Sequence, residues 1–326
     1  MTLTDSTVQE GKQQARRTSL IHSQPVRRFM ANRTAVIGGV LMLLLIAASL
    51  LSPWLARFEP QAVDVVSRLK PPSVKHWFGT DNLGRDVFSR TLNGTKISIQ
   101  VGLTVALVSS AAGLVIGLYS AYYRRLDQVL MRIMDGIFAF PAVLLAMAMM
   151  AALGPNVSNL MICLSIVFTP AVARIVRSSA LVVKEQTYIE AMRALGASRT
   201  RILWLHIMPG TLSPLIVQGS FVFAESIIVE AALSFLGAGI PAPMPSLGNL
   251  LSEGKQFIYN SWWMTLYPGF ALILSVLAMN WFGDGLRDML DPHARTKRKR
   301  SRKGSMNKNT SDNNNEKVSS ATQASS

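Results

Sequence analysis

The chain has 326 residues, of which 49% are hydrophobic and 16% are charged, and its formal net charge is +15. A soluble chain of this length would form about two domains, but so apolar a composition with so few charges is typical of a protein that crosses a membrane several times. The basic residues concentrate at the two ends and in the loops, which argues against a nucleic-acid-binding protein. Cys163 is the single cysteine, so no disulfide can form within the chain.

The N-terminal residues 1–30 are polar and basic and lack the apolar core of a signal peptide, so we expect a cytoplasmic tail. The first apolar run, residues 34–55, contains no charge and is long enough to cross a hydrocarbon core of about 30 Å. Further spans are predicted at residues 98–122, 133–152, 160–176, 210–235 and 264–281, which makes six in all.

Small residues and one proline mark two of these spans. Gly113 and Gly117 would let the second span approach another helix closely, although small residues are common in membrane helices. Pro141, after Phe140, should kink the third span, because proline removes a backbone hydrogen bond.

A polar segment, residues 56–96, lies between the first two spans. We expect Asp81 to cap a following helix and Asp86 to pair with Arg90 one turn later. Two aspartates could also bind calcium, but Arg85 lies between them and no further carboxylate follows at the required spacing. The segment resembles the FGTDxxGRD motif of the C-type permease of dipeptide and oligopeptide ABC importers through Gly79, Thr80, Asp81, Gly84, Arg85 and Asp86.

A second polar segment follows the fourth span. We expect a helix that begins with a capping box of Thr187 and Glu190 and stops at Gly196 in the left-handed conformation. Ser198 should cap a second helix, which Pro209 should close. Spacing alone favours an ordinary helical loop between two spans.

Resemblance to a family assigns this second segment a role. Glu190, Ala191, Gly196 and Pro209 resemble the EAA loop of ABC-importer permeases, although two positions, Met192 and His206, depart from the family pattern. The resemblance implies that the loop docks into a cleft of the ATPase subunit.

Lys and Arg residues indicate the orientation of the chain. With a cytoplasmic N-terminus, 25 of the 33 lie on the cytoplasmic side and 8 lie outside. The positive-inside rule therefore predicts that both termini are cytoplasmic, which places Glu190 on the side of ATP.

Two carboxylates lie in the fifth span, Glu225 and Glu230. A charge at the bilayer centre costs about 2.5–3.5 kcal/mol, so such a residue usually faces a bundle interior or a wet cavity. We therefore place both on a possible translocation path, with a purely structural role of Glu225 as an equal alternative. About 140° of helix separates them, which argues against a catalytic acid pair.

The C-terminal part carries two further resemblances. Residues 245–251 resemble the family's PSWGxxL, with Leu247 in place of tryptophan, and residues 280–292 resemble its closing NxxGDGLRDxLDP. The basic, Ser/Asn-rich remainder predicts a disordered tail near anionic lipid. No GxxxxGK[ST], HExxH, GxSxG or CxxC occurs, and the histidines are scattered, so we expect no catalytic, cofactor or metal site in this chain.

Together these features predict an all-α membrane protein with six transmembrane helices of the type I ABC importer permease architecture and a cytoplasmic coupling helix. The expected parts are a tail (1–30), the first transmembrane helix with an extracytoplasmic loop (31–96), the permease core (97–286) and a basic cytoplasmic tail (287–326).

The resemblance implies a permease subunit in the bacterial inner membrane that forms half of a pathway for di- or oligopeptides. Its implied partners are a second permease, two ATPase subunits that bind ATP and Mg, an extracytoplasmic solute-binding protein and membrane lipid, with no nucleic acid. Nickel chelates or glutathione are alternative solutes. A secondary transporter or a membrane enzyme is the alternative class, with Glu225 and Glu230 as its candidate residues.

Overall fold

The computed structural model describes residues 33–290, of which residues 33–287 belong to one compact unit. The described part consists of helices and connecting loops, without a β-strand. Within it, five helical runs are long and apolar enough to cross a membrane: α2 (Arg33–Leu50), α4 (Val87–Tyr122), α7 (Val157–Lys184), the run Arg199–Phe235 and α12 (Trp263–Leu290). The predicted tail at residues 1–30 lies outside the described residues. The predicted tail at residues 287–326 begins within α12, which extends to Leu290, and its remainder lies outside the described residues.

The run Arg199–Phe235 and the connections contain the remaining elements. Three successive elements form the run, namely α9 (Arg199–Arg201), the π-helical turn η2 (Ile202–Ile207) and α10 (Met208–Phe235). The shorter elements are α3 (Ser52–Leu55), the 3-10 turn η1 (Val65–Ser67), α5 (Arg124–Phe138), α6 (Ala142–Leu153), α8 (Thr187–Ala194) and α11 (Leu247–Lys255).

The predicted third span is wrong as a single helix. Its residues divide between α5 and α6, which meet at 93°. Pro141 is the N-cap of α6 and cannot donate a backbone hydrogen bond, so the expected kink becomes a break. With 12 residues, α6 extends about 18 Å, too short to cross a bilayer alone. Six spans are therefore obtained only if this bent pair counts as one.

The longest helix is α4, with 36 residues and a length of about 54 Å. It begins well before the predicted start at residue 98, because the Asp86 carboxylate caps it by accepting the backbone N–H of Ser89. The predicted small-residue face is confirmed: a Cβ added at Gly113 or Gly117 would lie within 3 Å of atoms in α7. The two helix backbones therefore approach closely.

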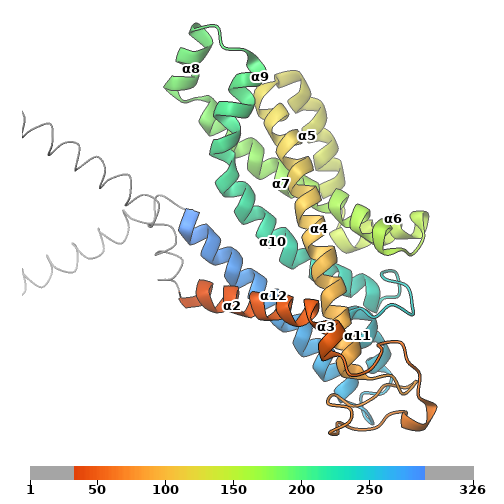
Figure 1. Ribbon diagram of the computed structural model, residues 1–326. Coiled ribbons are helices and arrows are strands. Elements are labelled where there is room, and N and C mark those ends of the chain that lie inside the picture. The colour runs from red at the N-terminus through yellow and green to blue at the C-terminus, as the bar shows by residue number, and fades with distance from the viewer. Residues whose placement is uncertain (1–32, 291–326) are drawn as a thin grey trace, which may run out of the picture. The chain divides into compact units, whose positions relative to one another are not determined.

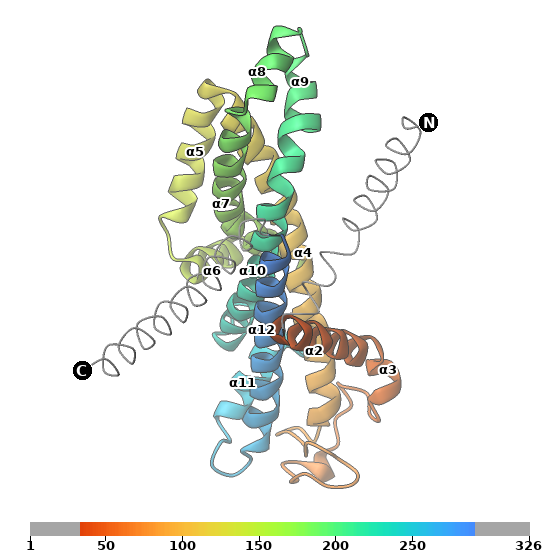
Figure 2. The same ribbon diagram turned by 90° about the vertical axis from the view of Figure 1, so that its left-hand side faces the viewer.

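Figures 1 and 2 show how α4 connects the two ends of the helical bundle. One of its ends lies near α8 and α9, and the other lies near α11 and the loop at residues 56–86. Apolar side chains of α4, α7 and α10 form the core between these ends, among them Val101, Leu118, Leu164, Val172, Phe223, Ile227 and Leu233. The two polar segments singled out in the sequence thus lie at opposite ends of one helix.

Candidate functional site

The first candidate is α8 with the turn that follows it. Ile189 is fully buried in the core and anchors the helix, and the Tyr188 hydroxyl donates to the backbone carbonyl of His206 at 3.4 Å. Glu190 is exposed, and Leu195, just past the helix, is 87% exposed. Glu190, Arg193 and Leu195 are therefore free to contact another protein while Ile189 anchors the helix.

Gly196 ends α8 in the predicted left-handed conformation, with φ of 81°. Its N–H donates to the carbonyl of Arg193 at 3.0 Å, and the N–H of Ala197 donates to the carbonyl of Met192 at 3.1 Å. This pair of hydrogen bonds is a Schellman motif. A Cβ added at Gly196 would meet no atom within 4 Å, so a side chain there would strain the backbone without a collision.

Other details of the predicted helix pair are wrong. The capping box is not formed, because Thr187 is the first residue of α8 and no side chain caps that helix. Ser198 is the N-cap of α9, but its side chain makes no capping hydrogen bond. Pro209 closes no helix; it is exposed in the first turn of α10, where a missing N–H costs little.

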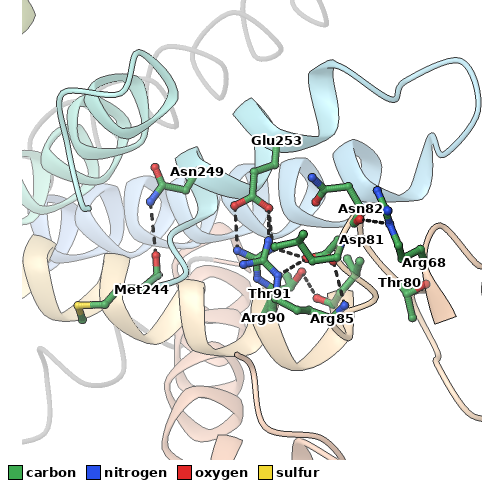
Figure 3. A network of polar contacts seen from close by, with 12 residues as sticks. Arg68, Thr80, Asp81, Asn82, Arg85, Arg90, Thr91, Met244, Asn249 and Glu253 are labelled. Carbon is green, nitrogen blue, oxygen red and sulfur yellow. Dashed lines mark hydrogen bonds and ion pairs between the residues drawn. The ribbon is translucent and has the colours of Figure 1, made fainter. Parts of the chain in front are cut away.

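The second candidate is a buried ion-pair network at the other end of α4 (Figure 3). One Nη of Arg90 donates to Asp81 and to Glu253 at 2.6 Å each, and the other donates to Glu253 at 3.0 Å. Arg85 contacts the same two carboxylates at 2.6 and 2.9 Å. The side chains of Arg90 and Asp81 are only 2% and 1% exposed. Two arginines and two carboxylates thus form a neutral cluster that joins the loop, α4 and α11.

The two aspartates of the motif have different roles from those predicted. Asp81 caps no helix; its carboxylate accepts the backbone N–H of Arg85 and closes the loop. Asp86 is the cap of α4, and it lies 2.9 Å from Nδ1 of buried His76, so the predicted pair of Asp86 with Arg90 is wrong. Within residues 33–290, no group of three or more His, Cys, Asp or Glu residues is arranged to hold a metal.

The two glycines of the motif allow the loop to close on itself. Gly79 and Gly84 have φ of 75° and 80°. A Cβ at Gly84 would overlap the backbone carbonyl of Asp64, and one at Gly79 would lie 2.7 Å from Nε1 of Trp263. That indole N–H donates to the carbonyl of Thr80 at 3.1 Å. The residues of the motif therefore hold the loop against α11 and α12.

Sequence reasoning missed Glu253, the residue on which the network depends. It lies 163 positions from Arg90 along the chain, so no local spacing connects the two. The one available signal was that Glu253 is the only carboxylate of α11.

The two carboxylates of α10 lie in different environments. Glu230 has no exposed surface, and its carboxylate accepts hydrogen bonds from Ser98 at 2.7 Å and from Ser234 at 2.8 Å. Glu225 is exposed and has no hydrogen bond or ion pair within residues 33–290. In this conformation only Glu225 has a surface with which to contact a solute, and its place on a path stays a prediction.

Two protein-family profiles match the chain. Residues 113–296 match the binding-protein-dependent transport system inner membrane component. Residues 24–72 match the N-terminal transmembrane domain of oligopeptide transport permease C. The first match contains α8 and α10, and the second contains α2.

Several curated proteins are similar over most of their length. A putative peptide transport system permease protein of Brucella abortus is 48% identical over 82% of this chain and 90% of its own. The probable D,D-dipeptide transport system permease protein DdpC of Escherichia coli is 41% identical over 79% and 87%. The glutathione transport system permease protein GsiD of Pectobacterium atrosepticum is 42% identical over 82% and 89%. Among solved structures, the inward-facing methionine ABC transporter MetNI matches with a TM-score of 0.46 and 23% identity, over 60% of this chain and 94% of that chain.

Proposed function

The chain belongs to the family of binding-protein-dependent transport system inner membrane components, and we propose that it forms half of a pathway that carries peptides across the inner membrane. As a transport permease it works with ATPase and solute-binding partners, and it is not itself an enzyme. The family match carries this proposal, because it covers the run of helices from within α4 to α12. Similarity to peptide, D,D-dipeptide and glutathione permeases supports peptides as the solute class.

The proposed assembly contains this chain, a second permease, two ATPase subunits and an extracytoplasmic solute-binding protein. Both termini lie in the cytoplasm, so the α8 end of the bundle faces the ATPases and the α11 end faces the solute-binding protein. The distribution of Lys and Arg supports this orientation.

In this assembly α8 is the coupling helix that docks into an ATPase subunit. Glu190, Ala191 and Leu195 are exposed, whereas Ile189 anchors the helix from the opposite side. Gly196 sets the angle between α8 and α9, and Pro209 begins the helix that continues into the bundle. When the ATPases close on ATP, they move α8, and the spans alternate between the two access states.

Glu225 lies on the translocation path in this proposal. A carboxylate in the middle of a membrane helix is tolerated where water or a counter-charge reaches it. The ammonium group at the N-terminus of a peptide is such a counter-charge. Glu230, which is fully buried and bonded to two hydroxyls, holds α4 and α10 together beside this path.

The test is reconstitution of the chain with its partners in lipid vesicles. Uptake of labelled dipeptides, longer peptides, glutathione and a nickel chelate is measured with and without ATP. We expect ATP-dependent uptake of at least one peptide class that requires the solute-binding protein. Uptake by the two permeases without any ATPase subunit would contradict the proposal and favour a secondary transporter, and uptake of the nickel chelate alone would contradict the assignment of peptides.

A further inference from the structure

A cation–aromatic contact connects α8 to α4, a helix to which α8 is not adjacent in the chain. Arg193 lies in the last turn of α8, and its Cζ is 5.8 Å from the ring centroid of Tyr122. Tyr122 is the last residue of α4. This distance is within the range of a cation–π interaction. By contrast, α8 is joined covalently to α7 and, through Gly196, to α9.

A second cation lies at the same helix end. Lys184, the last residue of α7, donates from Nζ to the backbone carbonyl of Ala121 at 2.7 Å and to that of Tyr122 at 3.4 Å. Its Nζ is also 5.7 Å from the Tyr122 ring. The last carbonyls of a helix lack partners within the helix, and a cation there also offsets the negative end of the helix dipole. The C-terminal ends of α4, α7 and α8 therefore meet at Tyr122.

We propose that Tyr122 is the positioning residue through which a movement of α8 reaches α4, an inference that rests on the proposed role of α8 as the coupling helix. The ring is half-buried against the core and contacts one cation from α7 and one from α8. Lys184 and Arg193 repel each other, and the electron-rich ring offsets that repulsion. A displacement of either helix therefore changes the contact with the end of α4.

At its N-terminal end, α4 is held by the ion-pair network, so a movement of α4 reaches the loop at residues 56–86 and α11. The helix runs without a break for 36 residues, and Arg90 in its first turn is held by Asp81 and Glu253. Figure 2 shows α4 extending from the region of α8 to the region of α11. A rigid helix fixed to polar contacts at both ends carries a displacement from α8 to the loop at residues 56–86 and to α11, on the opposite end of the bundle.

The experiment compares Tyr122→Leu with Tyr122→Phe in the full reconstituted complex, with uptake per ATP hydrolysed as the readout. Leucine removes the aromatic face and phenylalanine keeps it. We expect Tyr122→Leu to lower the ratio about two- to fivefold, the factor that corresponds to a cation–π contact of about 0.5–1 kcal/mol. Tyr122→Phe should keep the wild-type ratio. A purely structural role would lower the yield of complex and leave the ratio unchanged, which would overturn the inference.

A matched pair of arginine variants keeps the test valid if Tyr122→Leu assembles poorly. Arg193→Gln and Arg199→Gln each remove one exposed arginine, from α8 and α9 respectively, but Arg199 has no ion pair or ring contact within residues 33–290. Of the two arginine variants, we expect only Arg193→Gln to lower the ratio, and we expect the double variant Tyr122→Leu/Arg193→Gln to be no worse than Tyr122→Leu alone. Equal effects of the two arginine variants, or additive effects of Tyr122→Leu and Arg193→Gln, would overturn the inference. Failure of the wild-type complex to couple uptake to ATP would instead contradict the proposed function.

Discussion

Removal of Arg90 tests whether the ion-pair network holds the loop at residues 56–86 to the bundle. The change is Arg90→Met, which keeps much of the side-chain volume and removes the charge. Asp81 and Glu253 then retain only Arg85, so the cluster changes from neutral to a net charge of −1. Because the Asp81 side chain is 1% exposed, water cannot compensate for this charge.

The expected cost follows from burial. Breaking a buried ion pair by removing one partner costs about 3–5 kcal/mol, and we expect about 3 kcal/mol here because Asp81 keeps Arg85. Glu253→Gln should cost less, about 1.5 kcal/mol, because Glu253 is 28% exposed and the amide oxygen still accepts hydrogen bonds. The double variant Arg90→Met/Glu253→Gln restores neutrality with Asp81 and Arg85 intact. It should therefore cost about 3 kcal/mol, less than the sum of the two single variants.

The measurement is the midpoint temperature at which the detergent-purified complex loses its assembled state. Arg68→Met is the matched control, because Arg68 lies in the same loop, is exposed and donates only to the carbonyl of Asn82 within the described residues. We expect Arg68→Met to have the midpoint temperature of the wild type. We expect Arg90→Met to have a lower midpoint temperature than Glu253→Gln. A midpoint of Arg90→Met equal to that of Arg68→Met, or an additive double variant, would refute the reasoning.

Three further predictions concern the coupling helix, the orientation and the path. Gly196→Leu should insert and assemble but lose uptake and receptor-stimulated ATPase activity, because a left-handed conformation costs a non-glycine residue about 1–2 kcal/mol. Normal uptake and ATPase activity in a well-expressed variant would contradict a coupling role for Gly196. Ser198→Cys should react with a membrane-impermeant thiol reagent only from the cytoplasm, and Tyr259→Cys, at a site that is 98% exposed, should react only from outside. The native Cys163 is buried and should not react. The opposite labelling would reverse the orientation. Glu225→Gln should slow the uptake of cationic peptides relative to neutral ones with assembly unchanged, and an unchanged ratio would exclude Glu225 from the path.

Features set by neighbouring residues could be predicted from the sequence, and features set by distant residues could not. The apolar runs located the spanning helices, and Gly196 ends α8 as expected because a left-handed cap depends on a few consecutive residues. The pairing of Asp86 with Arg90 is a wrong prediction, because Arg90 is held instead by Asp81 and by the distant Glu253 of α11. The helix through Pro209 also depends on tertiary contacts, since Ile202 and Ile207 of the π turn are each only 1% exposed and keep the run in the core.

The two carboxylates of α10 differ in whether residues 33–290 supply a partner for the charge. Glu230 is compensated by Ser98 and Ser234, so it can be buried whatever surrounds the bundle. Glu225 lacks such a partner within residues 33–290, and Ile228, one turn further on, is 48% exposed. If this face met lipid, the carboxylate would cost about 2.5–3.5 kcal/mol, and no hydrogen bond within residues 33–290 offsets that cost. We therefore predict that the face around Glu225 lies against the second permease or the aqueous path, and only the path requires the negative charge that Glu225→Gln removes.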